Sequence, residues 1–233
     1  SEWNSALCLL CFYGMVYYPG GDSVLKEACA ENFTNVPELI ERGAKRIELC
    51  DNLAVGGTTP SVGVIKIATA YCSDKNVSLI VILRPRGGDF VYSAMEKAIM
   101  MRDLEEIIAL QANGIAVGAL TAANALDKPF LEEIAKLASD NGIELAFHMA
   151  FDEIPEEKQR DALLWLGEIG FKRILTHGGP KENTIFDNAA HIAELAKITP
   201  DMTIMPGGGI TKDNLADLEK VLELTEVHGT RIV

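Results

Sequence analysis

The chain has 233 residues, of which 48% are hydrophobic, and its formal net charge is −13. This length suits one large domain or two small ones, and the apolar content is sufficient for a substantial buried core. The negative charge argues against nucleic acid or an anionic membrane as a partner, because binding phosphate requires concentrated positive charge. No segment approaches the roughly 18 uninterrupted apolar residues of a transmembrane helix.

Residues 1–23, "SEWNSALCLLCFYGMVYYPGGDS", differ from the rest of the chain because they are apolar without helical periodicity. They lack the basic region and the cleavage site of a secretory signal. We expect an upstream extension that is not part of the natural chain, which would then begin near Val24. The alternative is a genuine apolar arm that covers part of the domain. Cys8 and Cys11 form a Cys-x-x-Cys pair, which by itself is weak evidence for a metal site.

From Val24 onward, short apolar runs alternate with amphipathic helical segments, such as 93–113 and 128–141. Their apolar residues recur at the 3.6-residue spacing of a helix. Four junctions, 41–49, 111–118, 139–145 and 168–175, each contain a glycine, which we expect to end a helix because glycine accepts the left-handed conformation. Strands are predicted over eight runs: 24–30, 45–50, 78–84, 114–118, 143–148, 172–176, 202–205 and 225–229.

This alternation predicts an α/β fold with a parallel sheet, and eight strands favour a (β/α)8 TIM barrel formed by residues 24–233 as a single domain. A doubly wound open sheet is the alternative, but no dinucleotide fingerprint follows the first strand. Seven helices are predicted, and the last strand ends too close to Val233 for an eighth, so the barrel is expected to lack its last helix. A second copy of the chain or residues 1–23 could cover the open flank, which makes a homo-oligomer one of the expected arrangements.

The active sites of such barrels lie at the C-terminal ends of the strands. A period of two places Glu27 and Cys29 on one face of the first strand, and Glu48 and Cys50 on one face of the second. Adjacent strands are about 5 Å apart, so the two cysteines are expected side by side. Paired thiolates are soft ligands that suit Cu(I). The alternative is that both are ordinary buried cysteines.

Other polar residues follow later strands, among them His148 and Asp152 in "FHMAFD". Together with Glu27 and Glu48, they are the candidates for proton transfer. Charged residues that face the inside of a barrel must be paired or hydrogen-bonded. The alternative to a functional site is therefore an internal salt-bridge network that fixes the register of the barrel.

Two stretches suggest an anion site. In "ILRPRGGDF" (82–90), Arg84 and Arg86 follow a buried strand, where they either bind an anion or pair with Glu27, Glu48 or Asp89. "MPGGGITKDNL" (205–215) follows the seventh strand, where backbone N–H groups often hold phosphate in this fold. The anion-binding candidates in this loop are Gly207, Gly208 and Gly209, and Thr211 is expected to cap the next helix. The alternative is that the glycines only form tight turns.

Several of these stretches together resemble the CutC family, which is named for copper homeostasis. The resemblance extends from Val24 to the C-terminus and implies a TIM barrel, a cytoplasmic location and Cu(I) held by Cys29 and Cys50. Two residues depart from the family pattern: Met149 stands where arginine is usual, and His177 stands where serine is common. The stretches that carry the resemblance are "ERGAKRIELCDNLAVGGTTPSVGVIK" (41–66), "RPRGGDFVYS" (84–93), "FHMAFD" (147–152), "LTHGG" (175–179) and "EVHG" (226–229).

The sequence therefore predicts a cytoplasmic copper-homeostasis protein that binds Cu(I) through Cys29 and Cys50, with nearby glutamates setting the local charge. The odd number of cysteines without disulfide spacing agrees with a reducing compartment. The alternative is a TIM-barrel enzyme acting on a small anionic or phosphorylated metabolite. The arginines and the 207–209 loop would then bind the anion, and His148 or a glutamate would transfer protons. The sequence leaves open whether the protein is an enzyme.

Overall fold

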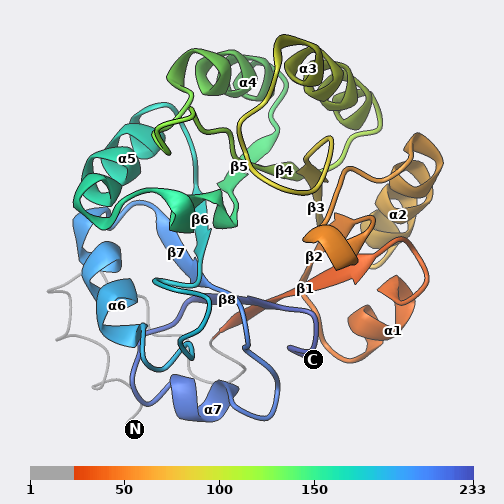
Figure 1. The fold of residues 1–233 in the computed structure, drawn as a ribbon. Coiled ribbons are helices and arrows are strands. Elements are labelled where there is room, and N and C mark those ends of the chain that lie inside the picture. Colours follow the sequence, from red (N-terminus) through yellow and green to blue (C-terminus); the bar gives the residue numbers. More distant parts are fainter. Residues whose placement is uncertain (1–23) are drawn as a thin grey trace, which may run out of the picture.

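The structure, a computed structural model, describes residues 24–233. Its eight parallel strands pair in the order β8-β1-β2-β3-β4-β5-β6-β7 and surround a common axis, as Figure 1 shows. Within the described chain, β7 and β8 lie next to each other without forming a ladder, so the barrel is nearly closed. Every strand agrees with its predicted range to within one residue at either end: β1 Leu25–Glu31, β2 Arg46–Cys50, β3 Ser78–Leu83, β4 Gly114–Val117, β5 Glu144–Phe147, β6 Arg173–Thr176, β7 Thr203–Pro206 and β8 Glu226–Gly229.

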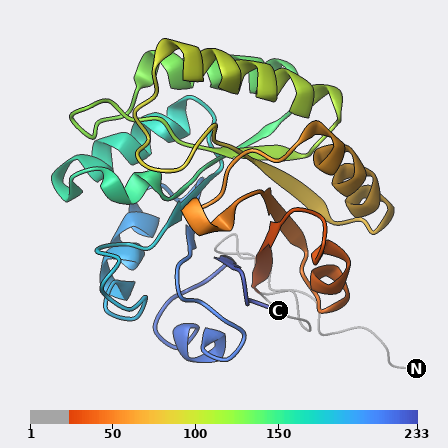
Figure 2. The same cartoon turned by 45° about the vertical axis from the view of Figure 1, so that its right-hand side comes forward.

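Seven helices lie around the outside of the strands (Figures 1 and 2), which confirms the predicted (β/α)8 barrel. No helix follows β8 in residues 230–233. The last of the seven is a single turn that begins at Leu215, with Asn214 at its N-cap, so the prediction that Thr211 caps it is wrong. The helices are α1 Val36–Glu41, α2 Val62–Asp74, α3 Ala94–Ala109, α4 Lys128–Asp140, α5 Glu156–Glu168, α6 Ala189–Ile198 and α7 Leu215–Leu218, and two 3-10 turns are η1 Leu53–Val55 and η2 Met149–Glu153.

The glycines at the helix–strand junctions follow the prediction at three of four positions. Gly43, Gly142 and Gly170 have φ values of 106°, 69° and 104°, in the left-handed region. At 111–118 the prediction is wrong, because Gln111 takes the left-handed conformation and Gly114 lies inside β4. A Cβ atom at Gly114 would lie 2.7 Å from the carbonyl oxygen of Glu144, so this glycine lets β4 and β5 approach closely.

The apolar core lies between the strands and the helices, where the outward faces of the strands pack. The inside of the barrel is different, since the described residues form only small clusters there, one of Ile80, Ala116 and Ala146 and another of Ile82 with Cys29 and Cys50. The remaining inward positions of β1, β2 and β8 carry polar and sulfur-containing side chains. The candidate site is therefore built into the barrel wall.

Residues 1–23, including Cys8 and Cys11, lie outside the described residues. The proposals of a non-native extension and of a Cys-x-x-Cys site stay predictions. No helix in residues 24–233 combines the length and the apolar character needed to cross a membrane.

Candidate functional site

Four inward-facing side chains come together on the neighbouring strands β1 and β2. The register pairs Glu27 with Arg46 and Cys29 with Glu48, and residues paired in this way point to the same side of a parallel sheet. All four are buried. Cys50 lies one step further along the same face of β2, at the C-terminal end of the strand.

The two cysteines meet as the period of two predicts. Their Sγ atoms are 3.8 Å apart, both thiols are free, and the Sγ of Cys50 lies 3.6 Å from Oε2 of Glu48. Ligand atoms of Cys29, Glu48 and Cys50 all lie within 4.8 Å of one another, so these three side chains could hold one metal ion. Gly57 covers the pair closely, because a Cβ atom there would lie 3.3 Å from the sulfur of Cys50.

His228, at the end of β8, completes this cluster. Its Nδ1 is 2.8 Å from Oε1 of Glu27, to which it donates a hydrogen bond, and its Nε2 is 3.5 Å from Oε2 of Glu48. His228 is one of the polar residues at the strand ends, in the family stretch "EVHG", but no role was predicted for it. Its position at the end of the last strand, beside the first strand of a closed barrel, is the signal that could have assigned it.

The pKa values of the two thiols are shifted in opposite directions by their neighbours. A hydrogen bond from Cys50, aided by His228, lowers the pKa of Cys29 to about 5 although burial opposes this. The same hydrogen bond, together with burial, raises the pKa of Cys50 well above its usual value. The arrangement at neutral pH is thus a Cys29 thiolate that accepts a hydrogen bond from the Cys50 thiol.

Burial raises the pKa of both carboxylates of the cluster, but their neighbours shift the two in opposite directions. Burial raises the pKa of Glu48 to about 8, and the negative charges of Cys29 and Glu27 add to this effect. The pKa of Glu27 is about 2, because a hydrogen bond from His228 and the charge of Arg46 outweigh burial. The pKa of His228 is raised well above its usual value, since the charge of Glu48 and the hydrogen bonds to Cys29 and Glu27 outweigh burial.

Below this cluster, the inside of the barrel holds an ion-pair network. Arg46 binds both Glu27 and Glu226, and Arg173 binds Glu144 and lies 3.7 Å from Glu226. The salt-bridge alternative therefore describes Glu27 correctly, whereas Glu48 forms no ion pair with a lysine or arginine among residues 24–233. The arginines of this network were missed because their partners come from distant parts of the chain.

The two arginines of "RPRGGDF" serve different purposes. The guanidinium of Arg86 pairs with Asp89 and Glu96 on a half-exposed surface. Arg84 is buried and donates to three backbone carbonyl oxygens, those of Val55, Gly57 and Gly88, at 2.8–3.0 Å. Arg84 thereby holds the loop that covers Cys50.

His148 and Asp152 lie on the other side of the barrel mouth, after β5. Nδ1 of His148 accepts a hydrogen bond from the N–H of Ala150, and its Nε2 has no partner among the described residues. Asp152 accepts hydrogen bonds from the hydroxyl of Thr176 and the N–H of His177, which tie it to the end of β6. Neither residue contributes an atom to the Cys29–Glu48–Cys50 cluster.

The glycines after β7 lie near a third group of side chains. Gly208 and Gly209 line a cleft of about 500 Å³ with Met149 and His177. A Cβ atom at Gly208 would lie 2.8 Å from Nδ1 of His177, and one at Gly207 would lie 2.5 Å from Leu175. These glycines thus allow close packing at the mouth of the barrel, and the two residues that depart from the family pattern, Met149 and His177, both line this cleft.

The fold and the cluster define a class of protein: a (β/α)8 barrel with a buried thiol pair at the C-terminal end of β1 and β2. Residues 24–233 match the CutC family. The chain is 49% identical over 211 residues to family protein CutC of Enterococcus faecalis, covering 90% of this chain and all of that protein. It therefore belongs to the CutC family.

Two further relatives support membership of the CutC family. The copper homeostasis protein cutC homolog of Dictyostelium discoideum is 34% identical over 227 residues, covering 87% of this chain and 80% of that protein. The crystal structure of CutC from Streptococcus agalactiae, whose name assigns it to copper homeostasis, superposes with a TM-score of 0.86 at 42% identity and covers 90% of this chain and all of that one. A deoxyribose phosphate aldolase from Aeropyrum pernix, with a TM-score of 0.65 at 11% identity over 90% of this chain and 86% of that one, shares the fold alone.

Proposed function

We propose that this protein binds Cu(I) between Cys29 and Cys50 and serves copper homeostasis in the cytoplasm. The observation that carries the proposal is the pair of buried sulfur atoms 3.8 Å apart, of which one is held as a thiolate. Cu(I) prefers soft sulfur ligands. The names of the relatives from Dictyostelium discoideum and Streptococcus agalactiae add support.

The surroundings of the sulfurs suit a monovalent cation. The Cys29 thiolate already carries the negative charge that attracts Cu(I), and the ion would displace the remaining thiol proton from Cys50. Glu48 offers a hard oxygen that Cu(I) binds poorly, so its role in this proposal is to stabilise the Cys29 thiolate by a hydrogen bond and not to bind the ion. The buried position of both cysteines would protect bound Cu(I) from water and oxidants.

An anaerobic Cu(I) titration against a competing chelator tests the proposal. The Cys29→Ser/Cys50→Ser variant should bind Cu(I) more than about a hundredfold more weakly, since losing even an outer-shell partner of a metal site costs about 10–100-fold. Glu48→Gln should cost about tenfold on the same basis. The matched control is Cys72→Ser, because Cys72 is a buried free cysteine on α2, remote from the cluster.

If the double variant keeps the parent affinity, the copper proposal is wrong. Loss of affinity in Cys72→Ser of similar size would show that the titration reports unfolding and not a site. Fractionation of cells that express the protein, with immunodetection in each fraction, tests the cytoplasmic location, and recovery from the membrane or secreted fraction would contradict it.

A further inference from the structure

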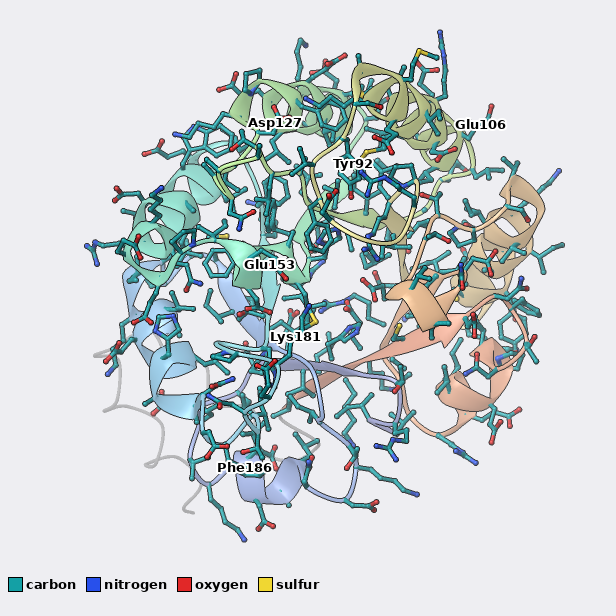
Figure 3. The ribbon with its side chains drawn as sticks, in the orientation of Figure 1. Tyr92, Glu106, Asp127, Glu153, Lys181 and Phe186 are labelled. Atoms are coloured by element: carbon teal, nitrogen blue, oxygen red, sulfur yellow. The ribbon has the colours of Figure 1, made fainter. Side chains whose placement is uncertain are left out.

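A second cleft, of about 600 Å³, opens at the mouth of the barrel beside β3, β4 and β5. Its walls include the apolar side chains of Phe90, Leu120 and Met149, and Arg84 contributes its positive charge. Lys181 and Glu153 lie over the middle of the ring of strands (Figure 3) and pair with each other at 3.4 Å. The cleft thus combines an apolar wall with a cationic group.

Arg84 brings a charge to this cleft that nothing in the described chain neutralises. The side chain is buried, and its three hydrogen bonds go to carbonyl oxygens. No carboxylate of residues 24–233 forms an ion pair with it, and its Nε–H has no acceptor there. The other cations near the cleft are paired, Arg86 with Asp89 and Glu96, and Lys181 with Glu153. A buried charge without a counter-ion costs free energy. Binding of an anion from outside the chain would reduce this cost at Arg84.

Two neighbours of Arg84, His148 and Tyr92, also favour an anion from outside the chain. His148 accepts a hydrogen bond at Nδ1, so the neutral ring carries its hydrogen on Nε2, and this second buried donor also lacks an acceptor in residues 24–233. Burial raises the pKa of Tyr92 to about 12 against the pull of Arg84, so its hydroxyl stays neutral and leaves the guanidinium charge uncompensated. The ring of Phe90, which lines the cleft, lies 4.9 Å from the guanidinium of Arg84 and 5.0 Å from the ring of His148.

We propose that this cleft binds a small organic monoanion, a carboxylate with an apolar body, whose charge is neutralised by Arg84. The apolar body would lie against Phe90, Leu120 and Met149. A monoanion fits better than a phosphate dianion, because only one positive charge is uncompensated and the carboxylates of Asp89 and Glu153 also line the cleft. This site is distinct from the proposed copper site, since none of its lining residues belongs to the thiol cluster, and the two are linked only by Arg84, which holds the loop that covers Cys50.

Calorimetric or NMR titration of the full chain tests the proposal with three carboxylates: isovalerate, benzoate and phenylacetate. Each is compared with its own neutral amide, and benzoate also with phenyl phosphate. At least one carboxylate should bind about tenfold more tightly than its amide, the difference expected for a charge-assisted hydrogen bond. Benzoate should also bind more tightly than phenyl phosphate. Equal binding of every carboxylate and its amide, or no binding of any carboxylate, would overturn the proposal.

Variants locate the site. Arg84→Gln should weaken carboxylate binding about tenfold or more. Asn124→Asp places a negative charge in the cleft at a position whose φ of 50° aspartate accepts, and should weaken binding roughly fourfold. Lys66→Gln is the control, because Lys66 lines a different cleft, together with Lys45 and Asn113. If circular dichroism shows that Arg84→Gln does not fold, the carboxylate affinity of Asn124→Asp tests the site instead. An affinity equal to that of the parent would then refute the site.

The copper proposal and this one can fail separately. The Cys29→Ser/Cys50→Ser variant should bind the carboxylate as the parent does, and Asn124→Asp, which changes the cleft away from the loop that covers Cys50, should bind Cu(I) as the parent does. Loss of carboxylate binding in the double cysteine variant would show that the anion sits in the thiol cluster and would contradict the site proposed here.

Discussion

The barrel mouth has two walls, each with a buried histidine, and they differ in charge. On the β8–β1–β2 wall, His228 lies between Glu27 and Glu48, and its pKa is raised well above the usual value against the effect of burial. On the β3–β5 wall, burial and the charge of Arg84 lower the pKa of His148 to about 3. Both side chains are buried to a similar degree. Burial lowers the pKa of both, so the neighbouring charges account for the difference between the two histidines, and they make one wall suitable for a cation and the other for an anion.

The largest expected effect comes from removing the cation that supports the first wall. Arg46→Met would leave the buried Glu27 and the partly buried Glu226 without this partner, and should lower the free energy of unfolding by about 3–5 kcal/mol. Denaturant unfolding at neutral pH measures it. Arg102→Met is the control, because Arg102 is exposed and, among residues 24–233, pairs only with Glu105, and it should change stability by about 0.5 kcal/mol or less.

A second substitution tests whether the lost stability comes from uncompensated negative charge. If the cost of Arg46→Met is the uncompensated charge, Arg46→Met/Glu226→Gln should recover part of the lost stability. Equal stability of Arg46→Met and Arg102→Met would show that the network contributes little and that the comparison of the two walls rests on the wrong groups.

The next largest expected effect is a pH dependence of stability that arises from His148 on the second wall. Because the pKa of His148 is about 3 in the folded protein and its ordinary value is 6.5, the unfolded chain binds a proton between these values that the folded protein does not. The stability due to neutral His148 is therefore present above pH 6.5 and is lost as pH falls toward about 3, by about 1.4 kcal/mol per pH unit at most.

His148→Asn tests this point, since asparagine keeps an acceptor for the N–H of Ala150. Its free energy of unfolding, measured in denaturant from pH 7 downward, should fall less steeply than that of the parent. Parallel curves for the two proteins would mean that His148 is not held neutral by burial and Arg84.

The smallest effect tests the charge of His228 on the first wall. His228→Gln removes one of the interactions that hold the pKa of Cys29 near 5, so this pKa should rise by roughly one unit, equivalent to about 1.4 kcal/mol. The ultraviolet absorbance of the thiolate, titrated without oxygen, reports the change, and Cys29→Ser identifies the Cys29 signal. An unchanged midpoint would indicate that Cys50 alone sets the state of Cys29.

The sequence by itself determined the eight strands, because apolar runs bounded by helical segments define a parallel sheet locally. It also placed Cys29 and Cys50 side by side, since a period of two and the pairing of consecutive strands are short-range properties. The family followed from contiguous stretches such as "RPRGGDF". The reading of Gly114 as a helix stop was wrong, because the close approach of Glu144 is not visible along the chain.

Only the tertiary structure decided the partners of the charges. Glu27 meets His228 because the barrel brings the last strand beside the first, and Arg46 meets Glu226 for the same reason. Arg84 and Arg86 stand two residues apart in one motif, yet one holds backbone carbonyls and the other pairs with carboxylates. Charges act through space over several ångströms, so their pairing depends on which strands the closed barrel makes neighbours.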